Sequence, residues 1–122
     1  MIQLSHYCEN TRIYTIICVN KILYIYIMLK YFVELVGTFF FLSVIMVAVK
    51  SNIKWVFLPI GLALAMVVFW GGSISGGHFN PAVSIMFLMN GELSVMDTMV
   101  YILSQIVGGI LALVYYHNYA MV

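Results

Sequence analysis

The chain alternates long apolar stretches with short polar interruptions, and three of the stretches are long enough to cross a membrane. They lie at about 31–49, 55–71 and 96–116. A membrane-spanning helix needs about 20 predominantly apolar residues. The polar residues at 50–54 and 90–94 are expected to form short connections. The pattern therefore predicts an all-α membrane protein with three transmembrane helices.

The N-terminal residues 1–27 follow a weaker pattern. Residues 13–29 are rich in Ile, Tyr and Leu, but Asn20 and Lys21 interrupt them. A Lys near the centre of a span costs about 2.5–3.5 kcal/mol on insertion scales. We therefore expect an N-terminal extension that is either an extra hydrophobic helix of weak membrane preference or a disordered lead, ahead of a main domain at 28–122.

A glycine-rich break separates the second and third predicted spans. It runs from Gly71 to Phe79 and is followed by Asn80, Pro81 and an apolar run. Asn is a favoured N-cap residue and Pro is favoured at the first helical position. The pattern predicts a helix over 80–89, roughly 12–14 Å long. Such a helix is less than half as long as a hydrocarbon core of about 30 Å, which predicts a re-entrant segment lining a polar cavity.

The N-terminus of this half-helix has chemistry suited to a pore. Helix N-termini present unsatisfied N–H groups and about half a positive charge. The Asn80 side-chain oxygen can accept from the backbone, which leaves its NH2 group to donate outward. Such donors beside a positive helix end would bind a water or hydroxyl oxygen and repel cations. The physics alone leaves a second interpretation open, a kinked hydrophobic hairpin with a capped break.

Composition supports the membrane prediction and excludes several other classes. The chain is 65% apolar and 7% charged with a mean hydropathy of +1.10, whereas about a quarter of residues are charged in soluble domains. The net charge of +1 predicts no nucleic-acid partner. No nucleophile–base or paired-carboxylate pattern occurs, so we expect neither an enzyme nor a cofactor. Cys8 and Cys18 lack metal-ligand spacing, and we interpret them as small apolar residues with no metal site.

Four blocks of the sequence resemble one known family. Residues 75–84 (SGGHFNPAVS) resemble the first signature loop of the major intrinsic protein family, the aquaporins and glycerol facilitators. Residues 33–39, 61–63 and 101–109 resemble the first three helices of that family. The blocks occur in family order and cover residues 28 to about 116. The resemblance implies the first repeat of such a channel, with three spans and a re-entrant half-helix.

The resemblance also implies pore roles for particular residues. Asn80 would donate to the permeating molecule at mid-membrane, and Pro81 and Ala82 would start the half-helix. The filter position of the second helix, which is aromatic or His in water channels and Trp in glycerol channels, is Ile60 here. The solute therefore stays open between water, glycerol and another small neutral molecule.

Further residues would support the loop. His78 would lie near the cytoplasmic mouth, with the carbonyls of Gly76 and Gly77 lining the approach; the alternative for His78 is a hydrogen bond that satisfies the loop without gating. Glu34 would be buried and accept hydrogen bonds from the loop backbone, or would be a snorkelling interfacial carboxylate. Gln105 would be a helix-packing group.

The family's pore is built from two inverted repeats, and the resemblance covers the first. We therefore expect a multi-pass membrane channel, or half of one, for passive transport of water or small neutral solutes such as glycerol. Its partners would be the lipid bilayer, the solute, and a second copy or another polypeptide that supplies the second half. The alternative is a truncated, non-conducting membrane protein that associates with other channel subunits.

Overall fold

The computed structural model describes residues 12–120 of this chain, with its side chains described from residue 16 to residue 119. The elements are α1 (Arg12–Lys50), α2 (Phe57–Ser75), α3 (Pro81–Met89), α4 (Val95–Tyr115) and a π-helical turn, η2 (Tyr116–Ala120). Three helical segments are long and apolar enough to cross a membrane, namely Ile16–Lys50, Phe57–Ser75 and Val95–Tyr119. The prediction of an all-α membrane protein with three spans and a short helix between the second and third is confirmed.

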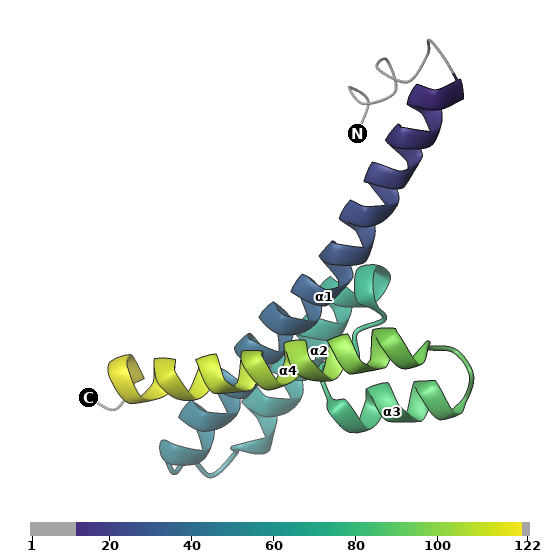
Figure 1. Cartoon of the computed structure of the whole chain (residues 1–122). Coiled ribbons are helices and arrows are strands. Elements are labelled where there is room, and N and C mark those ends of the chain that lie inside the picture. The colour runs from purple at the N-terminus through teal and green to yellow at the C-terminus, as the bar shows by residue number, and fades with distance from the viewer. Residues whose placement is uncertain (1–11, 121–122) are drawn as a thin grey trace.

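Helix α1 lies at the centre of the arrangement and packs against both α2 and α4, while α3 packs against α4. Figure 1 shows α4 crossing α1, with α3 beside the N-terminal half of α4 and α2 behind. The N-terminal half of α1 projects away from the other helices (Figure 1). The helices therefore form one packed unit, from which the N-terminal half of α1 extends.

The first helix is longer than the sequence predicts. It has 39 residues, which corresponds to about 58 Å, whereas the predicted first span covers 31–49. Asn20 and Lys21 do not interrupt it, because both side chains are exposed and a Lys is compatible with helical backbone. Residues 12–27 thus form a helix that continues into the first span. The remainder of the predicted extension, 1–11, lies outside the described residues.

The second helix also differs from the prediction, since it continues through Gly71 and ends at Ser75. Gly76 then takes φ = +90° and its N–H donates to the carbonyl oxygen of Gly72 at 3.0 Å. A left-handed glycine of this kind is a common helix end. The predicted break at 71–79 is therefore corrected to 76–80. Gly71 lies within the helix, where it packs against Phe79 and does not reverse the chain.

The ring of Phe79 fills a notch between α1 and α2 that two glycines create. A Cβ atom on Gly37 would lie 2.1 Å from a ring carbon of Phe79, and one on Gly71 would lie 2.7 Å from the ring. Phe79 forms the buried core together with Val33 and Val67. Its φ of +45° is uncommon for a bulky residue, so burial of the ring compensates for backbone strain. The Phe79 ring thereby packs the loop against both helices.

One sequence-based interpretation outside this core is wrong. Cys18 is disulfide-bonded and is not a free apolar residue. Disulfide pairing depends on two sulfur atoms meeting in space, so a missing C-x-x-C spacing says little about it. Cys8, for which the same interpretation was made, lies outside the described residues.

Candidate functional site

The N-terminus of α3 has the cap that the sequence predicts. Asn80 is the N-cap residue in an extended conformation (φ = −154°, ψ = 126°), and Pro81 is the first helical residue. The Oδ1 atom of Asn80 accepts a hydrogen bond from the N–H of Ala82 at 2.9 Å. The residue is exposed, and its Nδ2 group has no hydrogen-bond partner among the described residues. The amide NH2 can therefore donate to a molecule outside the chain.

A buried carboxylate on α1 holds the loop that precedes Asn80. Glu34 is 0% exposed. Its Oε1 accepts from Ser75 Oγ at 2.7 Å and from the N–H of His78 at 2.9 Å. Its Oε2 accepts from the N–H of Phe79 at 2.7 Å and from Gln105 Nε2 at 2.9 Å. Four donors match the acceptor positions of an ionised carboxylate, and they compensate for its removal from water.

Ser75 connects this carboxylate to the end of α2 and to α4. Its Oγ donates to Glu34 and accepts from the N–H of Gly77 at 3.1 Å. Its carbonyl oxygen accepts from the buried hydroxyl of Tyr101 at 2.6 Å. The last carbonyls of a helix lack intrahelical partners, so Tyr101 satisfies one of them. Neither of these roles, of Ser75 or of Tyr101, was predicted from the sequence.

His78 is buried beneath the loop. Its Nδ1 lies 3.1 Å from Ser84 Oγ, and its ring centroid lies 4.6 Å from that of Phe87. This residue lies between the spanning helices, and burial lowers the pKa of its ring below the usual range, whereas the Glu34 charge acts to raise it. The ring satisfies the loop through its hydrogen bond with Ser84. Its position near a pore mouth stays a prediction.

The structure gathers most, but not all, of the predicted site residues. Gln105 does more than pack helices, because its Nε2 donates to Ser84 Oγ at 3.0 Å as well as to Glu34. Ile60, by contrast, lies in the first turn of α2. It is 15 residues before the end of that helix, or about 22 Å along its axis. Ile60 is therefore remote from the loop within this chain.

A second polar cluster joins α1 to the start of α4. Asp97 Oδ1 accepts from Lys30 Nζ at 2.8 Å and from the Tyr31 hydroxyl at 2.6 Å. Ser94 caps α4 by accepting from the N–H of Asp97 at 3.0 Å. The Tyr31 ring meets the Tyr101 ring edge-on, with centroids 5.8 Å apart. The cluster therefore supports Tyr101 from the side. The partners of Asp97 on α1 lie more than 60 positions away in the sequence, and no local pattern predicted them.

Comparison with known proteins identifies relatives for most of the chain. Over 88 residues it is 40% identical to glycerol uptake facilitator protein-like 6 of Lactiplantibacillus plantarum, covering 70% of this chain and 41% of the relative. It is 39% identical over 88 residues to aquaporin Z of Photorhabdus laumondii, covering 65% and 38%. It is 42% identical over 84 residues to aquaporin-8 of Mus musculus, covering 65% and 32%. The chain thus spans about two fifths or less of these relatives.

The sequence also matches the model of the major intrinsic protein family over residues 20–121. The match covers more than four fifths of the chain and includes the loop, the half-helix and all residues bonded to Glu34. It begins within α1, ahead of the boundary predicted at residue 28. The family resemblance and the expected membrane localisation are confirmed. The chain therefore belongs to the major intrinsic protein family, whose members are passive membrane channels rather than enzymes.

Proposed function

We propose that this chain supplies one half of an aquaporin-type channel, in which Asn80 donates a hydrogen bond to water or a small neutral solute moving passively across the membrane. Family membership supports this, as do relatives named as aquaporins and as a glycerol uptake facilitator. The chain spans about two fifths of those relatives, and the part that it covers corresponds in this proposal to the first repeat.

The observation that carries the proposal is the state of the Asn80 amide. Its oxygen is occupied by the N–H of Ala82, so the NH2 group is the part left to face a solute. The N-terminus of α3 adds a positive partial charge at the same point, which disfavours cations. A solute oxygen would accept a hydrogen bond from the NH2 group there, and a hydrated cation would be repelled.

The length of α3 supports a position of this group at depth in the membrane. Nine residues correspond to about 13–14 Å, less than half of a hydrocarbon core of about 30 Å. A capped helix end at that depth needs a polar cavity around it. In this proposal a second half-helix, from another chain or a second copy, provides the opposite wall. The carbonyls of Gly76 and Gly77 would line one approach to Asn80, and the side chain of Ile60, at the other end of α2, would line the opposite one.

The alternative is a non-conducting subunit that associates with other channel chains. The exposed apolar face of α2 favours association of some kind, because Phe69 is 93% exposed and Met66 is 60% exposed. Large exposed apolar surfaces within spans face lipid or another helix. Association alone does not separate the two functions, so the test has to measure transport.

The test is osmotic shrinkage of vesicles that contain the full chain together with the C-terminal half of the aquaporin Z relative. Vesicles with each half alone and with lipid alone are the controls. We expect faster water efflux only when both halves are present, and a glycerol gradient in the same vesicles reports on the solute. Shrinkage at the lipid-only rate, together with co-purification of the two halves, would support the non-conducting alternative.

A further inference from the structure

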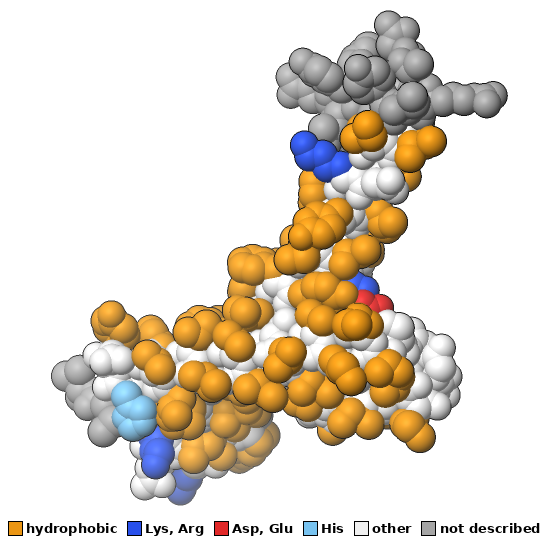
Figure 2. Space-filling model, in the orientation of Figure 1, with side chains coloured by type: hydrophobic (Ala, Val, Ile, Leu, Met, Phe, Trp, Pro, Cys, Tyr) orange, Lys and Arg blue, Asp and Glu red, His pale blue; other side chains and the backbone are white. Residues whose placement is uncertain are grey.

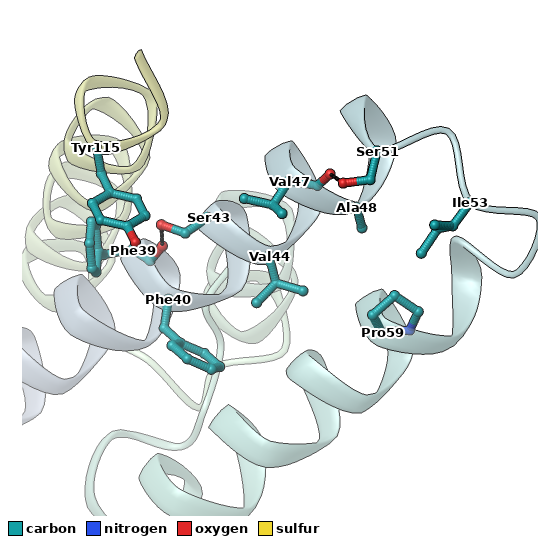
Figure 3. Close-up of a pocket in the computed structure, with 10 residues that line it drawn as sticks. All are labelled: Phe39, Phe40, Ser43, Val44, Val47, Ala48, Ser51, Ile53, Pro59 and Tyr115. Carbon is teal, nitrogen blue, oxygen red and sulfur yellow. Dashed lines mark hydrogen bonds between the residues drawn. The ribbon is translucent and has the colours of Figure 1, made fainter. Parts of the chain in front are cut away.

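A long apolar groove lies away from the Asn80 loop. It has a volume of about 580 Å³ and opens between the C-terminal half of α1, the first turn of α2 and the end of α4 (Figure 3). Its walls are mainly large apolar side chains, including Phe39, Phe40, Val44, Val47, Ile53 and Tyr115. None of these residues hydrogen-bonds to Glu34. The groove is thus separate from the proposed channel site.

The interior of the groove suits a hydrocarbon chain. Two serine hydroxyl groups line it, Ser43 within α1 and Ser51 directly after it, and both donate to carbonyl oxygens of α1. Ser43 Oγ donates to Phe39 at 2.7 Å, and Ser51 Oγ donates to Val47 at 2.7 Å, as the dashed lines in Figure 3 show. Because both hydroxyl groups already donate within the chain, the groove offers few hydrogen-bond donors to a polar ligand. Its apolar walls suit an apolar ligand.

The length of the groove matches one leaflet of a bilayer. Its α1 wall runs from Phe39 to Ala48, a rise of nine residues along a continuous helix, or about 14 Å. Half of a hydrocarbon core of about 30 Å is about 15 Å. Helix α1 is a candidate membrane span that ends at Lys50. With Lys50 at the membrane surface, a groove of this length would reach about mid-bilayer.

Positive charge collects at the surface end of the groove. Lys50 ends α1, and Lys54 lies in the connection to α2, so the two flank the lining residues Ser51 and Ile53. The sequence contains no Asp or Glu from residue 35 to residue 91 and none after residue 97. Figure 2 shows Lys and Arg colour gathered where α1 ends, and acidic colour only near the α1–α4 junction.

The remaining charges lie elsewhere. The ion pair in the described part of the chain uses Lys30, which is 20 residues, or about 30 Å, from Lys50 along α1. Trp55, two residues after the lining residue Ile53, is 67% exposed and packs edge-on against Phe57. Trp is enriched at the depth of lipid headgroups. A cationic, aromatic rim above an apolar groove is complementary to an anionic headgroup above an acyl chain.

We propose that this groove binds one acyl chain of an anionic phospholipid, with the lipid phosphate beside Lys50 and Lys54. The site is independent of the proposed transport function, because neither lysine touches the Asn80 loop and the groove needs no second half-helix. It gives the chain a preference among lipids that the apolar surface of α2 alone would not produce.

Native mass spectrometry of the full chain tests this. The protein is released from micelles containing equal amounts of phosphatidylglycerol and phosphatidylcholine with the same acyl chains. We expect retention of one phosphatidylglycerol in preference to phosphatidylcholine, and a roughly tenfold loss of that preference in the Lys50→Gln/Lys54→Gln variant. The matched control, Lys21→Gln, removes an exposed lysine far from the groove and should keep the preference.

A second variant separates the acyl chain from the headgroup. Val44→Trp fills the groove and should lower retention of both lipids equally, while circular dichroism verifies helix content. If Val44→Trp does not fold, the Lys50→Gln/Lys54→Gln variant tests the proposal by itself. Lys50 and Lys54 are exposed and lie outside the core, so their replacement should not disturb folding. Equal retention of the two lipids by the native chain would overturn the proposal. So would a dimer whose formation excludes lipid, since a second copy would then occupy the groove.

Discussion

The N–H of Phe79 donates to Oε2 of Glu34 at 2.7 Å, across 45 positions of sequence. Phe79 directly precedes Asn80, so a carboxylate on α1 fixes the backbone from which the proposed solute donor extends. The loop cannot leave this position without uncovering a buried carboxylate and several backbone donors, which is costly in an apolar medium. The orientation of Asn80 is therefore a property of the α1–loop contact as much as of the cap itself.

Replacing Glu34 with Gln should destabilise the fold substantially. The Gln side chain is similar in shape, but its NH2 group takes the place of a carboxylate oxygen. The groups that donate to this oxygen in the native chain would then face another donor, so at least one pair of hydrogen bonds is lost. We expect a loss of about 2–4 kcal/mol, because hydrogen bonds to a charged group contribute about 1.5–3 kcal/mol each. Unfolding by SDS, followed by circular dichroism, measures it. The control, Glu92→Gln, changes an exposed carboxylate and should lie within about 0.5 kcal/mol of the native chain.

The notch that holds the Phe79 ring predicts a contrast between two glycines. Gly37→Ala places a methyl group 2.1 Å from a ring carbon and should cost about 1–3 kcal/mol. Gly61→Ala meets no atom within 4 Å and should be neutral or stabilising. Adding Phe79→Leu to Gly37→Ala should recover part of the loss. Equal effects of the two Gly→Ala substitutions would contradict the packing described here.

Tyr101→Phe should loosen the loop while leaving the helices in place. It removes the hydroxyl that donates to the Ser75 carbonyl at 2.6 Å and leaves that buried acceptor unsatisfied. The expected cost is about 1–3 kcal/mol. Amide hydrogen exchange at 76–80 should become faster by one to two orders of magnitude. Tyr24→Phe, at an exposed position of α1, is the control, and unchanged exchange in Tyr101→Phe would argue against this role.

The Lys30–Asp97 pair should contribute less than the buried carboxylate. Its side chains are 18% and 25% exposed, so solvent screens the attraction. We expect Asp97→Asn to cost about 1 kcal/mol, mostly through the hydrogen bond to the Tyr31 hydroxyl. The same SDS titration at low and high salt measures it. A loss as large as that of Glu34→Gln would show that this cluster, not the buried carboxylate, dominates the fold.

Local signals in the sequence were sufficient for some features of the structure. The α3 start was predictable because Asn80 and Pro81 act within one helical turn. The end of α2 was misplaced because Gly71 was interpreted as a chain break, whereas glycine also permits close packing, here against Phe79. Nothing local distinguishes these two uses. Apart from the bonds between Glu34 and the loop, which the family resemblance implied, the long-range contacts could not be predicted from local signals. Tyr101 reaches Ser75 only because α4 lies beside the end of α2, which no periodicity reveals.

Osmotic water permeability of vesicles containing both halves, compared between Asn80→Asp and Asn52→Asp, tests the central claim most directly. The two substitutions make the same chemical change, one at the half-helix cap and one in the exposed α1–α2 connection. An aspartate at the cap position would still cap α3 but could not donate to a solute. We expect permeability near the lipid-only value for Asn80→Asp and native permeability for Asn52→Asp. Native permeability in both variants would contradict the assignment of Asn80 as the solute donor.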